Sequence, residues 1–331
     1  MSKVGIIANP ASDKDVRRLV AYASIMGNNE KTELVRRIIL GIDSTGVDEI
    51  LIMPDYCELG LRALSGLSHA NIRAKVSILD MTVHGTQEDS TTAMRLMKEL
   101  GVGCTVTLGG DGTNRAVAKG DRSIPLVTIS TGTNNVFPAM VEATTVGIAA
   151  GVVVSGKVDL KDVVATHKRL IITENGSEKD MALIDAVVME QPFIGARAIW
   201  KLSEVKQVIC TRAEPNSVGL SSIGGSVCPV GVEDDYGLYL KLGEGNIKAR
   251  AAVLPGVIQE VGIEEFKLIN LGEEVELLTR PCLVALDGER ELRVGATDEV
   301  KVRIERDGPH VVDINKATRE AAAQGFFTSR N

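Results

Sequence analysis

The segment Leu108–Asn114, with the sequence LGGDGTN, constrains the fold of this chain more than any other stretch. The run Cys104–Leu108 before it is rich in β-branched residues and predicts a buried strand. Arg115–Ala118 predicts the first turn of a helix, so three glycines lie in a strand-to-helix turn. Glycines permit positive φ, and their N–H groups can surround an anion at the positive end of a helix dipole. The segment is therefore predicted to bind phosphate groups.

Asp111 is the charged side chain within this turn. Phosphate groups repel a carboxylate, so its presence there predicts a chemical role. It could accept a proton from an attacking hydroxyl as a general base, or it could bind a divalent cation such as Mg²⁺. The alternative is a glycine turn that is purely structural.

Composition narrows the class of protein. A chain of 331 residues is long enough for two domains, and a formal net charge of −7 argues against a general nucleic-acid or membrane-surface partner. The five cysteines are far apart and odd in number, which indicates free thiols in a reducing compartment. The N-terminus lacks a signal-peptide pattern, and no apolar run approaches a membrane span. We therefore expect a cytoplasmic protein.

Strands alternate with helices over the first half of the chain. This order predicts a parallel sheet with helices on its faces, in a Rossmann-like α/β domain. Ligands bind at the carboxyl ends of the strands in such sheets, where Asn9 and the glycine turn should lie. Expected strands cover 4–8, 49–54, 76–79, 104–108 and 124–129, and expected helices cover 29–45, 87–100 and about 135–155.

Short strands separated by glycine or acidic turns follow residue 160 and predict an antiparallel, all-β sandwich. Asn175-Gly176, between the runs 169–173 and 182–189, predicts a hairpin. A helix is expected over 315–324. The other expected strands cover 207–212, 236–242, 246–254, 257–263, 265–270, 282–286 and 299–305.

Gly151–Val158 nearly fits the phosphate-binding pattern G-x4-G-K-[S/T]. However, Val158 replaces the hydroxyl residue that would bind Mg²⁺, and a helix precedes the motif where a strand is required. The segment is better explained as the end of a helix.

Two motifs support a family resemblance. Gly-Gly-Asp-Gly-Thr after a strand resembles the signature of the NAD kinase and diacylglycerol kinase superfamily. Val4–Ser12 resembles the first strand and the Asn-Pro turn of the same superfamily. The N-terminal half is most similar to the NAD-kinase-like group called acetoin catabolism protein X.

This resemblance implies an ATP-dependent kinase with Mg²⁺, a small-molecule acceptor and a homo-oligomeric assembly. It implies an α/β domain at 1–157, a β-sandwich acceptor domain at 158–308, and a segment 309–331 that returns to the first domain. The residues implied to bind nucleotide are Asn9, Gly109, Gly110, Gly112, Thr113, Gly132, Thr133 and Asn134. Thr133 and Asn134 could instead cap a helix.

Further motifs in the second half resemble those that line the acceptor cleft of the superfamily. The implied cleft residues are Asp185, Ser222, Asp287 and Glu289. Asp287-Gly288-Glu289 could instead form an acidic β-turn. The chain also departs from NAD kinases, which have Asn-Glu where Ile184-Asp185 stands and Thr-Ala-Tyr where Ser217-Val218-Gly219 stands. These changes remove polar contacts to a dinucleotide.

Three functions remain open from the sequence. The chain could be a NAD kinase, a kinase of another hydroxyl compound connected with acetoin, or a nucleotide-binding accessory or regulatory protein without turnover. Ile184 and Gly219 argue against the first function, and Asp111 argues against the third. Arg115 and Arg122 are candidates for neutralising phosphate charge.

Overall fold

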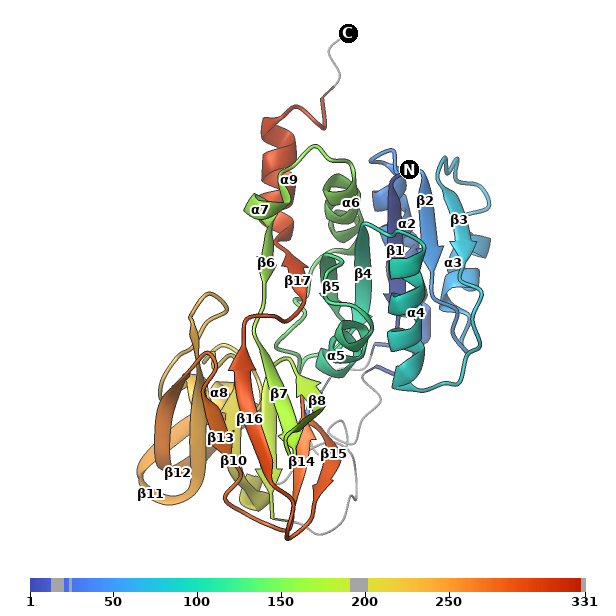
Figure 1. Cartoon of the computed structure of the whole chain (residues 1–331). Coiled ribbons are helices and arrows are strands. Elements are labelled where there is room, and N and C mark those ends of the chain that lie inside the picture. The colour runs from blue at the N-terminus through green and yellow to red at the C-terminus, as the bar shows by residue number, and fades with distance from the viewer. Residues whose placement is uncertain (13–20, 24–25, 191–201, 329–331) are drawn as a thin grey trace.

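The structure is a computed structural model that describes residues 1–12, 21–23, 26–190 and 202–328. It has two regions, one above the other in Figure 1. Within the described residues, no helix has the length and apolar character needed to cross a membrane.

The first region is built on a seven-stranded sheet. Strands β1 to β5 run parallel, as the alternation of strands and helices predicted. The spatial order is β3 (Lys75–Ile78), β2 (Glu49–Ile52), β1 (Lys3–Ala8), β4 (Cys104–Gly109), β5 (Leu126–Ser130), β17 (His310–Val312) and β6 (Val164–Thr166).

Helices cover both faces of this sheet. Apolar side chains of α2, α3, α6 and α9 pack on one face, and those of α4 and α5 pack on the other. The bounds are α2 (Asn28–Asp43), α3 (Leu59–Gly66), α4 (Gln87–Glu99), α5 (Asp111–Gly120), α6 (Ala143–Val154), α7 (Leu160–Val163) and α9 (Ile314–Ala323).

The second region is a sandwich of two antiparallel sheets, as expected. Side chains from both sheets form one core between them, and α8 (Leu220–Gly225) covers the outer face of the larger sheet. The larger sheet has the order β12 (Val257–Asn270), β11 (Tyr236–Leu254), β10 (Val205–Cys210), β9 (Asp185–Met189), β14 (Cys282–Leu286) and β15 (Glu289–Val294). The smaller has the order β13 (Glu274–Glu276), β16 (Val300–Glu305), β7 (Arg169–Glu174) and β8 (Ser177–Ala182).

The expected strand divisions 236–242/246–254 and 257–263/265–270 are wrong, because β11 and β12 are single long strands. Gly243 and Gly245 lie where the pairing register shifts, and they do not end the strand. A Cβ at Gly245 would lie 1.9 Å from the Ile263 carbonyl oxygen. These glycines therefore permit close approach of the partner strand.

The run 182–189 is also not one strand. The hairpin at Asn175-Gly176 is present, but its second arm, β8, ends at Ala182. The chain then passes to the other sheet as β9, which begins at Asp185. An apolar run buried on both faces contains no signal for such a change of sheet.

The chain passes between the two regions twice. Strand β6 and helix α7 belong to the first region although they follow residue 158, and β17 pairs with both β5 and β6. The C-terminal helix α9 packs on α6 of the first region. The domain limits 1–157, 158–308 and 309–331 remain a prediction.

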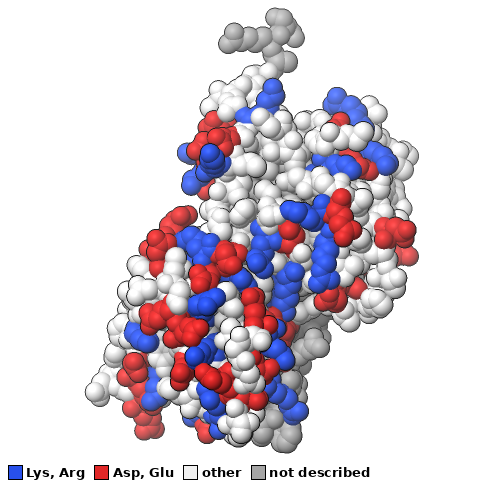
Figure 2. Space-filling model, viewed as in Figure 1, with Lys and Arg blue, Asp and Glu red and all other residues white. Residues whose placement is uncertain are grey.

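Charged side chains are interspersed on the face of the second region shown in Figure 2. Charged side chains of this region form ion pairs across β11 and β12, as Lys241 does with Glu264 at 2.6 Å and Lys248 does with Glu260 at 2.9 Å. Exposed pairs of this kind contribute little to stability. The position of the site therefore depends on the buried contacts between the regions.

Helices α2 and α6 cross in close backbone contact at Gly147. A Cβ at Gly147 would lie 2.3 Å from the Ile38 carbonyl oxygen. We expect Gly147→Ala to lower the free energy of unfolding by about 1–3 kcal/mol, because the helix backbones must separate. Urea unfolding measures this change. Gly27→Ala is the control, because a Cβ at Gly27 would lie 4.0 Å from its nearest contact, Glu30 Oε2. Equal losses in both variants would contradict the prediction.

Candidate functional site

The glycine turn lies at the junction of β4 and α5, and the helix begins earlier than the sequence predicted, at Asp111. Gly109, Gly110 and Gly112 are absent from the positive-φ residues of the described chain, so the turn does not use the positive φ that glycine permits. Their role is close approach. A Cβ at Gly109 would lie 2.5 Å from Thr113 Oγ1, and one at Gly110 would lie 2.6 Å from Asn135 Oδ1.

The N-terminus of α5 has unused hydrogen-bond donors. Helix geometry leaves the first N–H groups without an intrahelical acceptor, and Gly110 at the N-cap offers no side chain. Asn135 Oδ1 accepts weakly from the Asp111 N–H at 3.4 Å. Among the described residues, no loop or side-chain acceptor binds the N–H groups of Gly112 and Thr113. These two donors can bind an anion.

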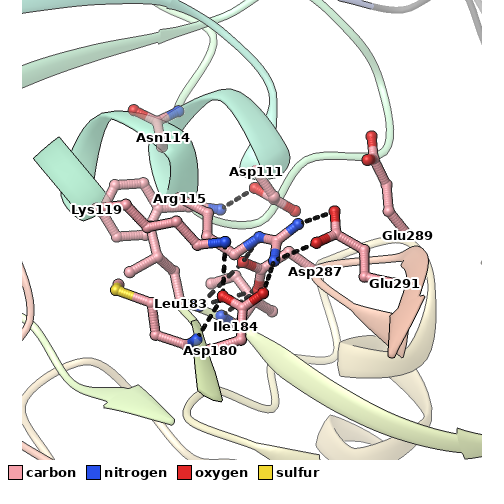
Figure 3. Close-up of polar contacts among 12 residues, drawn as sticks. Asp111, Asn114, Arg115, Lys119, Asp180, Leu183, Ile184, Asp287, Glu289 and Glu291 are labelled. Carbon is pink, nitrogen blue, oxygen red and sulfur yellow. Dashed lines mark hydrogen bonds and ion pairs between the residues drawn. The ribbon is translucent and has the colours of Figure 1, made fainter. Parts of the chain in front are cut away.

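Asp111 holds the neighbouring loop. Its carboxylate accepts the N–H of Phe137 at 2.8 Å, and each of its oxygens lies 3.1 Å from the N–H of Val136. Figure 3 shows Asp111 and Arg115 on the same side of α5. This structural role could not be predicted from local sequence, because it depends on residues 25 and 26 positions away.

The loop after β5 contains two buried polar atoms without a partner. These are Thr133 Oγ1 and Asn134 Oδ1, which have no hydrogen-bond partner in the described structure. The alternative that they cap a helix is wrong, since α6 begins at Ala143 with Glu142 as its N-cap. Gly132 contributes its carbonyl, which accepts from Ser130 Oγ at 2.8 Å. Buried polar atoms normally find partners, so these two indicate a ligand.

Asn9 joins its own turn to the glycine turn. Its Nδ2 donates to Thr113 Oγ1 at 2.9 Å, and its Oδ1 accepts the Ala11 N–H at 2.8 Å. The buried Lys31 ammonium donates to the Ser12 carbonyl at 2.8 Å and to Ser12 Oγ at 2.7 Å. Ser12 Oγ also accepts from Thr131 at 2.9 Å. The predicted residue Asn9 is therefore next to Thr113, and Lys31 holds the turn in place.

Asp287 lies in a turn, with φ of 50°, and its side chain is buried. The sequence offered a cleft carboxylate or an acidic turn at this position, and the turn is present. The Asp287 carboxylate accepts the N–H groups of Ile184 at 2.7 Å and of Leu183 at 3.0 Å. It also lies 3.4 Å from Arg115 Nε. Asp287 therefore fixes the β8–β9 connection against α5.

Arg115 is not free to neutralise phosphate. Its side chain is 1% exposed and pairs with Glu291, with Asp287, and with Asp180 at 3.7 Å (Figure 3). The other candidate, Arg122, donates to the Asp307 carbonyl at 3.1 Å on the surface. Neither arginine takes the role that the sequence suggested, because carboxylates and a carbonyl far away in the chain bind them.

Glu289 is the predicted cleft residue that reaches the glycine turn. It accepts from Gln87 Nε2 at 2.7 Å, and its Oε1 would lie 3.3 Å from a Cβ at Gly112. Ser222 has another role, since its hydroxyl donates to the carbonyls of Gly219 and Ala252 inside the second region. Asp185 is buried at the start of β9, where its carbonyl accepts the Asp287 N–H at 3.0 Å.

Four further residues around the site were not predicted from the sequence, namely Asn135, Phe137, His167 and Arg212. Arg212 follows β10 and donates to the Val136 carbonyl at 3.3 Å and to His167 Nδ1 at 2.6 Å. The ring of Phe137 lies 5.2 Å from its guanidinium. Asn135 adjoins Asn134, so the polar loop itself was a signal, whereas only tertiary structure brings Arg212 to this place.

Asp287 gives the site a pH-dependent stability. Burial raises the pKa of its carboxyl from 3.8 to about 7, although Arg115 and the Ile184 and Leu183 N–H groups act in the opposite direction. The folded protein then binds this proton more tightly than the unfolded chain, so stability falls as pH rises from about 4 to about 7. Urea unfolding across this range should show a steeper fall for the parent protein than for Asp287→Asn. Parallel profiles would contradict the assignment.

Comparisons with known proteins cover nearly the whole chain. Residues 4–158 match the family described as ATP-NAD kinase N-terminal domain, and residues 168–307 match the acetoin catabolism protein X C-terminal domain. Acetoin catabolism protein X of Cupriavidus necator is 37% identical over 339 residues, covering 98% of this chain and 94% of that protein.

One solved structure is similar at the level of the fold, and a second has a lower TM-score. Yeast NADH kinase complexed with NADH has a TM-score of 0.51 at 14% identity, covering 100% of this chain and 89% of that one. A putative diacylglycerol kinase from Bacillus anthracis has a TM-score of 0.46 at 12% identity, covering 94% and 98%.

Proposed function

We propose that this chain, which belongs to the acetoin catabolism protein X family, is an ATP-dependent kinase that phosphorylates a hydroxyl group of a small molecule. The observation that supports this most is a set of unused polar atoms on α5 and on the loop attached to it. The N–H groups of Gly112 and Thr113 have no acceptor in the described structure, and Thr133 Oγ1 and Asn134 Oδ1 are buried without a partner in the loop that Asp111 binds. Together they suit the phosphates of a nucleotide.

Each residue then has a defined task. The N–H groups of α5 bind and orient the donor phosphates, and Asn9 holds Thr113 in place for them. Asp111 fixes the loop of Thr133 and Asn134, and it is the carboxylate that would accept the proton of the attacking hydroxyl. Phosphoryl transfer depends mainly on positioning and on offsetting charge, which this arrangement supports.

Mg²⁺ fits the same site. No group of three or more His, Cys, Asp or Glu suited to a metal occurs in the described parts of the chain. Mg²⁺ usually binds through one or two carboxylates together with substrate phosphates, so no such group is needed. Asp111, next to Gly112 in the chain, and Glu289, against it in space, are the carboxylates that would face the ion. When bound, it would offset phosphate charge.

The acceptor is proposed to be NAD or a related hydroxyl compound, and the burial of Ile184 supports a compound other than NAD. The side chain of Ile184 is 1% exposed and packs with Phe137, Met181 and Leu183. It therefore offers no polar contact to a dinucleotide, whereas a smaller acceptor does not require one. A homo-oligomeric state and a cytoplasmic location remain predictions.

A second candidate is a nucleotide-binding accessory or regulatory protein of acetoin catabolism without turnover. The observation in its favour is that Val136 and Phe137 already occupy the Asp111 carboxylate. In this case Asp111 would serve the loop and would take no part in proton transfer.

Asp111→Asn distinguishes the two functions. We expect the kinase to lose product formation by about 10²–10⁴-fold, because the amide cannot accept the proton. The measurement is transfer from ATP·Mg²⁺ to NAD, read as NADP, and to acetoin and other hydroxyl compounds, together with ATP binding by calorimetry. Asp313→Asn is the matched control, because asparagine caps α9 equally well.

Product from the parent protein and not from Asp111→Asn would support the kinase. ATP binding to both proteins, with no product from either on any acceptor, would support the accessory function. Unchanged product from Asp111→Asn would contradict the role of Asp111 as the base.

A further inference from the structure

Arg212 is a buried cation of the second region that contacts the loop next to the proposed phosphate site. It is 7% exposed. It binds the carbonyl of Val136, and Asp111 binds the N–H of the same residue. The guanidinium of Arg212 and the carboxylate of Asp111 therefore hold the same residue of the loop.

The charge of Arg212 is not balanced by an ion pair. No carboxylate among the residues with described positions lies within 4.0 Å of its guanidinium, whereas Arg115 has three such partners. Burial lowers the pKa of Arg212, and the carboxylates of Glu214 and Asp111 oppose this only from farther away. Burying a charge without a close counter-ion is costly, so such a group indicates an anion that is supplied from outside.

His167 holds the guanidinium without offsetting its charge. Burial, together with the charges of Arg212, Arg306 and Lys168, lowers the pKa of His167 well below its usual value. The imidazole is therefore neutral, and its Nδ1 accepts from Arg212 at 2.6 Å. The ring of Phe137 lies between 5 and 6 Å from both groups, at 5.4 Å from His167 and 5.2 Å from Arg212.

We propose that Arg212 is the cation that offsets the charge of the donor phosphates. It is a positioning residue, because it acts through the Val136 carbonyl and through its charge, which water screens weakly at a buried position. The inference rests on the proposed function, since it requires phosphates at the N-terminus of α5. It also identifies the positive group that Arg115 and Arg122 do not supply.

Two substitutions separate the charge from the shape of the side chain. Arg212→Met removes the charge. Arg212→Lys keeps the charge but cannot form both hydrogen bonds, to the Val136 carbonyl and to His167 Nδ1. Calorimetry would measure the binding of ATP and of adenosine to both variants and to the parent protein. Arg122→Gln is the control. Arg122 lies at the surface, and in the described structure its side chain hydrogen-bonds only to the Asp307 carbonyl.

We expect Arg212→Met to weaken ATP binding by about 10–100-fold and to leave adenosine binding unchanged, because adenosine has no phosphate. Arg212→Lys should keep ATP binding within about threefold while lowering kcat, since a displaced loop impairs positioning. Arg122→Gln should behave as the parent protein. A purely structural role would instead weaken both ligands equally.

Parent-like ATP binding by folded Arg212→Met would overturn the inference and leave the proposed function standing. Absence of ATP binding to the parent protein would overturn the proposed function and the inference with it. If circular dichroism shows that Arg212→Met does not fold, Arg212→Lys decides alone. A loss of ATP affinity above about tenfold in that variant would overturn the inference, because the charge is still present.

Discussion

The ion pairs of the buried Arg115 join the two regions. Its guanidinium lies on α5 of the first region, and its carboxylate partners lie on β8, after β14 and on β15 of the second. Removing one partner would leave a buried charge uncompensated, which is far more costly than losing a surface pair. This constraint fixes the Asp287–Glu289 turn against α5 and brings Glu289 to the glycine turn.

The same helix organises the other side of the site through Asp111. Its carboxylate binds two successive N–H groups of the loop after β5, so the loop of Thr133 and Asn134 lies against the N-terminus of α5. The Lys31–Ser12–Thr131 contacts attach the turn of Asn9 to that loop. Three segments distant in the sequence therefore present polar groups toward one place, and the positive charge near them comes from Arg212.

Most of the fold could be predicted because its signals are local. Helical spacing predicted α2 and α4, β-branched runs predicted β1 and β4, and the Asn-Gly turn predicted the β7–β8 hairpin. The errors have physical causes. Gly243 and Gly245 permit close approach inside β11, the run at 182–189 changes sheets, and α6 begins only at Ala143.

The sequence by itself determined the family resemblance, the two fold classes, and the neighbourhood of Asn9, the glycine turn and the loop at 132–134, since strand order alone brings the carboxyl ends of parallel strands together. Only the tertiary structure decided which charged side chains form ion pairs within the protein. Arg115 pairs with carboxylates, and the Ser222 hydroxyl binds carbonyls of its own region. Arg212 binds the same loop residue as Asp111 and has no ion pair in the described chain. The reason is that pairing and desolvation of a charge depend on which groups surround it in space, and these groups lie many residues away in the sequence.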